Sequence, residues 1–137
     1  TDRAVTHRSA VVAGKVLVSS EVRELIASNA VSKGNVLEIA RIASIMGAKK
    51  TPELIPLCHP IAISGMDVRL ELVADGIEIS AEVRTTDRTG VEMEAFTAVA
   101  VAGLTIIDMI KAADAYATIT DIRLIEKTGG KNGHWTR

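Results

Sequence analysis

Hydrophobic residues follow two different periods along this chain, and the two periods separate strands from helices. Alternation with a period of two runs over residues 66–72 and again over residues 77–83, and Asp75-Gly76 lies between them. Because successive side chains of a strand point to opposite faces, this pattern predicts a hairpin of two strands, each with one apolar face. Segments rich in Val and Ile also predict a first strand over 4–18 and a last strand over 117–125.

Longer apolar patterns predict helices between these strands. Residues 21–28 and 35–46 carry helical patterns, and Asn35 is a suitable N-cap for the second of them. Gly47 follows as the expected helix stop. The longest pattern covers residues 90–113, which is too long for a strand and is rich in Ala, Met, Leu and Ile. We therefore expect two helices before the hairpin and one long helix after it.

The middle of the long helix, residues 95–107, carries no charge. A surface helix would present a polar face here, so we expect the sheet to cover one side and a second subunit the other. Glu94 and Asp108 would be roughly 21 Å apart along the axis, because each residue adds about 1.5 Å. One small pocket cannot easily use both ends of the same helix. Two helices packed antiparallel from two subunits can, which predicts a site at a subunit interface.

The order of elements is strand, two helices, hairpin, long helix and strand. If the first two helices form one crossover, this is the βαββαβ order of an α+β, ferredoxin-like fold. We expect an antiparallel sheet with the helices packed on one face and polar residues on much of the other. The length of 137 residues favours a single domain over 1–137. Its polar, Gly-rich residues 127–137 are expected to form a mobile C-terminal tail.

Composition narrows the class of protein. Aromatic residues make up only 2% of the chain, so the core must consist of Val, Ile, Leu and Ala. The net charge of −1 argues against a broadly basic nucleic-acid surface. Cys58 is the only cysteine, which excludes an internal disulfide and a multi-cysteine metal site. The uncharged run over 95–107 is shorter than the roughly 20 residues of a membrane span, so we expect a soluble, cytoplasmic protein.

Residues 51–60 hold all three prolines, and two of these enclose Leu57, Cys58 and His59 in a stiff, non-helical segment. A histidine here can exchange protons or bind phosphate, or it can simply be a hydrogen-bonded loop residue. Cys58 suits a buried, small apolar side chain better than a nucleophile. This segment is the first candidate for chemistry.

Charged residues at both ends of the long helix are further candidates. Glu92 and Glu94 could bind Mg²⁺ or a cationic partner, although the helix dipole also favours acids at a helix start. Asp108 and Lys111 form either a surface ion pair or, if the lysine is partly desolvated, an acid/base pair. Lys33 precedes a helix start and could contribute to an anion site, although such lysines are usually just solvated.

Three stretches together resemble the molybdenum-cofactor biosynthesis protein C family, the cyclic pyranopterin monophosphate synthases. They read KGNVLEIARIASIMGAKKTPELIPLCHPI, GVEMEAFTAVAVAGLTIIDMIKA and KTGGKNG, and the resemblance runs from about Asp2 to Gly133. The LIPLCHP and GVEMEA pieces are highly specific to that family in combination. The resemblance implies a ferredoxin-like subunit and a homo-oligomer, a hexamer built as a trimer of dimers, with active sites at subunit interfaces.

The resemblance also implies a reaction. The family converts 3′,8-cyclo-7,8-dihydro-GTP, the product of an upstream radical S-adenosylmethionine enzyme, to cyclic pyranopterin monophosphate with release of pyrophosphate. Such a lyase needs several proton transfers and a cationic pocket for the triphosphate. Mg²⁺ could accompany the pyrophosphate group, but no residue demands a metal. Neither a nucleic acid nor a membrane is an expected partner.

The family's functional residues are carried over by position. The resemblance implies that Asp108, Lys111 and Lys33 are catalytic, with the lysines moving protons and the aspartate orienting Lys111. The substrate-binding residues that it implies are Leu57, Cys58, His59, Glu92, Met93 and Glu94. The candidates for holding the phosphates are Lys33 together with Arg8, Lys49, Lys127 and Lys131, with His59 near the phosphates.

Two alternatives from other classes use the same residues differently. A non-catalytic nucleotide-binding oligomeric module would keep the lysines but would not need Asp108, Lys111 and His59 together. A purely structural oligomer would use the apolar helix but would leave His59 without a role. Incubation with the cyclised GTP intermediate separates catalysis from binding, because only an enzyme releases pyrophosphate.

Overall fold

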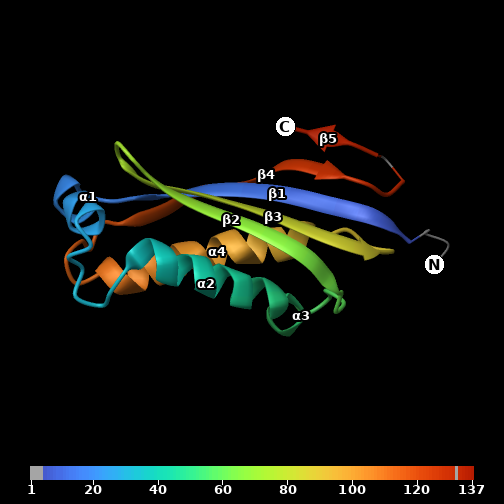
Figure 1. The fold of residues 1–137 in the computed structure, drawn as a ribbon, viewed down its shortest axis with the longest axis horizontal. Helices are drawn as coiled ribbons and strands as arrows, with labels where there is room; N and C mark the ends of the chain where they lie inside the picture. Colours follow the sequence, from blue (N-terminus) through green and yellow to red (C-terminus); the bar gives the residue numbers. More distant parts are fainter. Residues whose placement is uncertain (1–4, 132) are drawn as a thin grey trace.

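The computed structural model describes residues 5–131 and 133–137. In this part of the chain, five strands form an antiparallel sheet in the order β2-β3-β1-β4-β5 (Figure 1). The strands are β1 (Thr6–Leu17), β2 (Ile63–Val73), β3 (Gly76–Asp87), β4 (Thr118–Thr128) and β5 (Trp135–Thr136). The helices are α1 (Ser20–Ala27), α2 (Val36–Lys49), α3 (Thr51–Leu54) and α4 (Glu92–Ile110).

The long helices α2 and α4 lie side by side on one face of the sheet (Figure 1). The four long strands in the order β2-β3-β1-β4, with helices in both crossovers, are the ferredoxin-like arrangement, so this prediction is confirmed. The alternation of β3 is also as expected. Ile77, Ile79 and Val83 are buried toward the helices, whereas Glu78 and Glu82 lie on the face without helices.

The helix starts agree with the capping signals in the sequence. The Ser19 hydroxyl accepts a hydrogen bond from the backbone N–H of Val22 at 3.2 Å, which caps α1. Oδ1 of Asn35 accepts one from the N–H of Glu38 at 3.1 Å, which caps α2. Each cap satisfies one of the backbone donors that a helix start leaves unpaired. Helix α4 is shorter at both ends than the predicted residues 90–113.

Gly47 is inside α2 and does not stop it, so that prediction is wrong. The helix continues to Lys49. A Cβ at Gly47 would overlap the side chain of Val101 on α4. The glycine therefore lets the backbones of α2 and α4 approach closely, and tertiary packing offsets its low helix propensity.

Strand β4 is longer than the sequence predicts. Its ladder with β1 continues to the pair Ser9 and Thr128, whose hydroxyl oxygens are 2.6 Å apart. Trp135–Thr136 then returns as β5 beside β4. The boundary of the expected tail, residues 127–137, is therefore corrected, because Lys127 and Thr128 belong to the sheet.

Two expectations touch residues outside the described part. Ala4, the expected start of the first strand, is one of these residues, and β1 is described from Thr6. Asn132, inside the expected tail, is the other. The assignment of the chain to a single domain and the mobility of its tail stay predictions.

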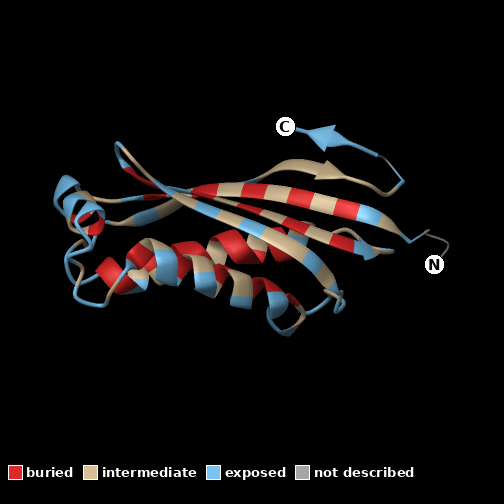
Figure 2. Cartoon of the chain, in the orientation of Figure 1, coloured by how far each residue is buried: buried red, intermediate tan, exposed pale blue. Residues whose placement is uncertain are grey.

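The outer surface of the helical layer is apolar and open. Leu104 of α4 is 60% exposed, and Ile42 and Met46 of α2 are exposed as well. Figure 2 shows bands of exposed and buried residues alternating along α2, as expected for a helix with only one side covered. Helix α4 is long and apolar enough to cross a membrane, but it packs on the sheet and 56% of its apolar window is buried. It is thus a core helix whose outer side is left uncovered by its own chain.

Candidate active site

Three charged side chains meet at the C-terminal end of α4. Nζ of Lys111 donates to Oδ1 of Asp108 at 2.8 Å. Nζ of Lys33 is 3.2 Å from Oδ2 of Asp108 and 3.2 Å from its backbone oxygen. Lys33 comes from the loop between α1 and α2, and the packing of α2 beside α4 brings it to this place. The structure therefore brings together Asp108, Lys111 and Lys33, which we call the Asp108 cluster.

The surroundings of the Asp108 cluster favour an ionised carboxylate. Hydrogen bonds from Lys111 first, and then from Lys33, hold the pKa of Asp108 below its ordinary value. All three side chains are at least half exposed, from 50% for Lys33 to 63% for Lys111. The partial desolvation of Lys111 that an acid/base role calls for is thus not supplied by this chain alone.

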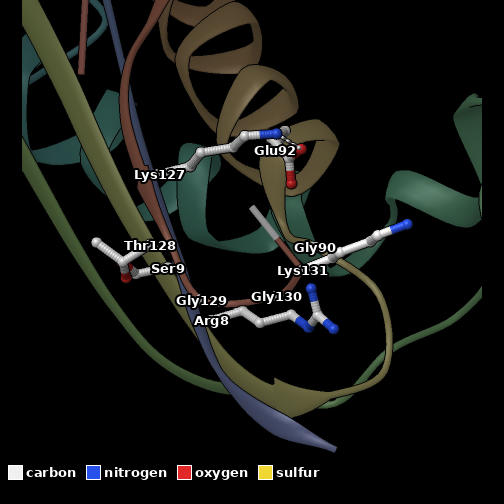
Figure 3. A pocket seen from close by; sticks show the side chains of 9 residues that line it. All are labelled: Arg8, Ser9, Gly90, Glu92, Lys127, Thr128, Gly129, Gly130 and Lys131. Atoms are coloured by element: carbon white, nitrogen blue, oxygen red, sulfur yellow. Dashed lines mark hydrogen bonds and ion pairs between the residues drawn. The ribbon is translucent and has the colours of Figure 1, made fainter. Parts of the chain in front are cut away.

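A second polar region lies at the N-terminal end of α4. A cavity of about 260 Å³ opens between β1, the end of β4 and the segment before α4 (Figure 3). Its lining residues are Arg8, Ser9, Gly90, Glu92, Lys127, Thr128, Gly129, Gly130 and Lys131. Three of the five cations expected to hold phosphates line this cavity. The other two do not, because Lys49 ends α2 and Lys33 lies in the Asp108 cluster.

Arg8 is held firmly in the wall of this cavity. Its side chain is nearly buried, and Nε donates to the backbone oxygen of Asp87 at 3.0 Å. Gly129 and Gly130 cross over β1 with φ values of 89° and 77° (Figure 3). A Cβ on Gly129 would overlap the backbone oxygen of His7, so glycine is needed there for both the backbone conformation and the space, and a Cβ on Gly130 would displace the guanidinium of Arg8.

Lys127 and Glu92 link the two elements that border the cavity. Nζ of Lys127 lies 3.4 Å from Oε2 of Glu92, which ties the end of β4 to the first turn of α4 (Figure 3). Arg8 and Lys131 add two further positive charges. Three cations and one carboxylate thus line the cavity, and this balance favours an anionic ligand.

The loop that carries Leu57, Cys58 and His59 follows α3. Leu57 is 92% exposed and His59 is exposed, whereas Cys58 is partly buried. Sγ of Cys58 is 3.8 Å from Oε2 of Glu94. Burial, followed by the nearby Glu94, raises the pKa of the Cys58 thiol. A thiol that keeps its proton agrees with the interpretation of Cys58 as a structural residue, because the thiolate is the nucleophilic form.

The acidic residues at the start of α4 do not converge on one point. Glu92 faces the cavity and pairs with Lys127, whereas Glu94 is buried beside Cys58. Met93 between them is exposed. Within residues 5–131 and 133–137, no three His, Cys, Asp or Glu side chains gather as metal ligands would.

The Asp108 cluster and the cavity lie at opposite ends of α4. The helix includes both Glu94 and Asp108, so its rise places them roughly 21 Å apart. One end offers a cationic cavity and the other offers groups that exchange protons. A reaction that needs both functions at one substrate cannot use the two ends of the same helix.

Some cavity residues carry no signal in the sequence. Ser9 and Thr128 belong to strands at opposite ends of the chain, and only the register between β1 and β4 brings them together. Gly90 precedes α4 and was singled out only as part of a helical pattern. The Gly-rich residues around Gly129 were predicted only as part of a mobile tail.

A ferredoxin-like subunit with a cavity lined by three cations and a lysine–aspartate cluster has the features of a protein class that acts on small anionic molecules. The model of the MoaC family matches residues 1–130, and the chain belongs to this family. The family resemblance seen in the sequence is therefore confirmed.

Curated relatives give the same picture. The chain is 59% identical over 133 residues to a cyclic pyranopterin monophosphate synthase of Streptomyces coelicolor, covering 97% of the chain and 78% of the relative. It is 54% identical to cyclic pyranopterin monophosphate synthase 2 of Mycobacterium tuberculosis, covering 100% and 82%. It is 50% identical to a cyclic pyranopterin monophosphate synthase of Heliobacterium modesticaldum, covering 96% and 84%.

Proposed function

We propose that this chain is the lyase of molybdenum cofactor biosynthesis that converts 3′,8-cyclo-7,8-dihydro-GTP to cyclic pyranopterin monophosphate and pyrophosphate. Membership of the MoaC family carries this proposal, since relatives at 50% identity and above are named for the same synthase activity. The cationic cavity supports it independently, because the substrate carries a triphosphate and the leaving group is an anion.

The cavity at the N-terminal end of α4 is the proposed phosphate site. Arg8, Lys127 and Lys131 face a triphosphate there, and the hydrogen bond from Arg8 to Asp87 fixes one of these cations before substrate arrives. Closure of the cyclic phosphate joins a substrate hydroxyl oxygen to the α-phosphorus, and the bond from that phosphorus to pyrophosphate breaks. Preorganised cations stabilise the negative charge that grows on the departing pyrophosphate.

The Asp108 cluster is the proposed site of proton transfer. Asp108 accepts hydrogen bonds from both Lys111 and Lys33, so one carboxylate fixes the positions of two groups that can give or take protons. The ring rearrangement and the closing hydroxyl each need such a group, because a general acid or base must lie within hydrogen-bond reach of the proton it moves.

A second copy of the chain completes the site in this proposal. The open apolar side of α2 and α4, which includes Ile42, Met46 and Leu104, is the surface on which the copy packs. In a two-fold dimer, the same surface is used by both copies. Antiparallel α4 helices then place the Asp108 cluster of one copy beside the cavity of the other, and cover the exposed Lys111. A hexamer of three such dimers is the proposed assembly.

The loop and the start of α4 are the proposed substrate contacts outside the phosphates. Leu57, His59 and Met93 are exposed, and Glu92 lines the cavity itself. We assign any Mg²⁺ to the phosphate oxygens of the substrate, because the described side chains form no cluster of metal ligands. The substrate comes from a radical S-adenosylmethionine enzyme, and the proposed location is the cytoplasm, with no nucleic-acid or membrane partner.

Two measurements test this function. Purified protein is incubated with 3′,8-cyclo-7,8-dihydro-GTP, and pyrophosphate and cyclic pyranopterin monophosphate are quantified. Release of both products in equal amounts is the expected result. Binding of the substrate without release of pyrophosphate would instead indicate the non-catalytic nucleotide-binding module.

The shared site is tested with two inactive variants produced together. Lys111→Ala damages one end of α4 and Lys127→Ala damages the other, so a mixed dimer keeps one site with both ends intact. Random pairing of the two variants restores about a quarter of wild-type activity. The matched control pairs Lys111→Ala with Asp108→Asn, which damages the same end in both copies and restores nothing. Absence of recovery in the first mixture would contradict the composite site.

A further inference from the structure

The last strand, β5, is much shorter than the strand it pairs with. It consists of the two residues Trp135–Thr136, whereas β4 has 11 residues, and two register pairs join the strands (Figure 1). A ladder of this length supplies few backbone hydrogen bonds, so its stability depends on further contacts. Residues 134–137, which we call the β5 brace, make these contacts.

Both ends of the β5 brace are bound to β4. At one end, the backbone N–H of Arg137 donates to the oxygen of Ile125 at 2.8 Å, and its Nε donates to the oxygen of Leu124 at 2.7 Å. At the other end, Nε2 of His134 is 2.6 Å from Oε2 of Glu126. Two side chains of the brace therefore hold the short strand in place.

The β5 brace lies directly behind one wall of the cationic cavity. Lys127, which lines the cavity, follows Glu126 in β4, and its register partner in β5 is Trp135. Opposite residues of an antiparallel pair share a face, so Trp135 is the cross-strand neighbour of the lysine. Gly130 and Lys131, in the segment after β4, also line the cavity (Figure 3). The brace thus borders the segment that supplies two of the three cations.

We propose that His134 and Arg137 are positioning residues, which hold β5 on β4 and thereby fix Lys127 and Lys131 at the cavity before an anion arrives. None of the described residues 134–137 lines the cavity, so the brace acts through the two lysines. Fixing a cation in advance strengthens anion binding, because less entropy is lost on association. The use of the brace in turnover rests on the proposed function, in which pyrophosphate leaves from this cavity.

Glu126→Ala gives the sharpest test, because positioning and charge predict opposite changes. By charge alone, loss of a carboxylate next to Lys127 should tighten the binding of an anion. Loss of the contact with His134 should instead weaken binding of inorganic pyrophosphate about fivefold, as measured by titration calorimetry. Glu126→Gln loses the charge but keeps an oxygen acceptor, so it should bind pyrophosphate at least as tightly as the wild type. Tighter binding in the Ala variant, or equal weakening in both variants, would overturn the proposal.

Arg137→Ala tests the other end of the brace and has a matched control. It should weaken pyrophosphate binding and raise KM about fivefold while kcat changes less, because substrate and transition state lose the same binding. Arg123→Ala is the control, since Arg123 of β4 also donates to a backbone oxygen, that of Asp121, at 2.7 Å. It removes the same charge without touching the brace, and should change neither quantity. Equal effects in the two variants would indicate loss of charge and would overturn the positioning role.

Fluorescence of Trp135 distinguishes failure of this proposal from failure of the proposed function, because it needs no substrate. Trp135 is the only tryptophan of the chain and is 39% exposed. In Glu126→Ala and Arg137→Ala its emission should move to longer wavelength as the indole enters water, whereas Glu126→Gln should keep the wild-type emission. Unchanged emission in both Ala variants would overturn the brace even if the enzyme is active. Shifted emission with weaker pyrophosphate binding, in a protein without turnover, would leave the brace standing and remove only the proposed lyase activity.

Discussion

The two ends of α4 differ in how firmly the fold of the chain holds their charged and polar side chains. At the N-terminal end, Arg8 is nearly buried against a backbone oxygen, Lys127 reaches from β4 to Glu92, and Glu94 is buried beside Cys58. At the C-terminal end, every member of the Asp108 cluster is at least half exposed. One end is thus organised by the fold of a single chain, whereas the other is open to solvent in that chain.

This difference in burial predicts that substitutions at the two ends of α4 affect folding stability to different extents. Exposed ion pairs contribute little to folding, because water screens them and long side chains lose entropy when they are held. The close geometry of the Asp108 cluster is therefore not explained by stability. At the other end the groups are held by buried contacts, so substitutions there are expected to affect folding as well as the proposed activity.

The sharpest test of the comparison is Lys111→Ala, which has the largest expected effect. Loss of a general acid or base lowers the rate of product formation by at least about a hundredfold. The Tm should stay near that of the wild type, because the lost pair with Asp108 is exposed. Lys15→Ala is the control, since Lys15 also forms an ion pair, with Asp75 at 2.6 Å, but on the face without helices. Near wild-type turnover in Lys111→Ala would remove this lysine from the mechanism.

An intermediate effect is expected from Leu104→Glu on the open side of α4. A carboxylate placed in an apolar interface is buried without a partner, and it should weaken subunit association at least about tenfold. Sedimentation velocity across a concentration series measures this change, and activity should fall with the assembly. Tyr116→Glu, at another exposed apolar residue outside the helical layer, should leave the mass unchanged. An unaltered oligomer in Leu104→Glu would place the interface elsewhere.

The smallest effect concerns the pKa of Asp108, which can be followed by NMR titration of its carboxyl group. Lys111→Ala should raise this pKa toward its ordinary value, and Lys33→Ala should raise it less, because Lys111 is the larger cause of the lowering. The pKa is depressed in the folded state, so the stabilisation exists above the unfolded pKa and is lost as the pH falls through the folded one. In Lys111→Ala the folded pKa lies nearer the unfolded one, so that loss should be smaller and should be complete at a higher pH.

Asp114 is the internal control for this titration. Its pKa is lowered mainly by a hydrogen bond from the backbone N–H of Ser19, with 2.7 Å between the nitrogen and Oδ2. Substitution of a lysine in the Asp108 cluster should not change it. Equal shifts of both aspartates would indicate a change in the fold and not the loss of one contact.

Periodicity alone predicted the architecture because each element has a regular apolar face. Residues 66–72 and 77–83 alternate without interruption, and they form β2 and β3. The prediction that Gly47 ends the helix was wrong, because it used only the low helix propensity of glycine and not the packing of α2 against α4. Position 47 requires a residue without a side chain because Val101 of α4 lies against it, and this contact is seen only once the two helices are packed.

The site was predictable where its members are close in the sequence. Asp108 and Lys111 are three residues apart on one helix, so their contact follows from helical geometry. The approach of Lys33 depends on how α2 packs, and the place of Arg8 beneath Gly130 depends on the register of β1 with β4. Such long-range contacts leave no local pattern, and here only the resemblance to a family pointed to them.

Helix α4 also acts as a rigid spacer, and this affects how activity should depend on the concentration of the protein. No flexing of a helix brings together groups that its rise holds roughly 21 Å apart. If the proposed site needs two copies, a folded monomer should be inactive. Activity per molecule should then rise with protein concentration until association is complete. A cell that makes a few copies of this polypeptide would obtain less than a proportional share of product.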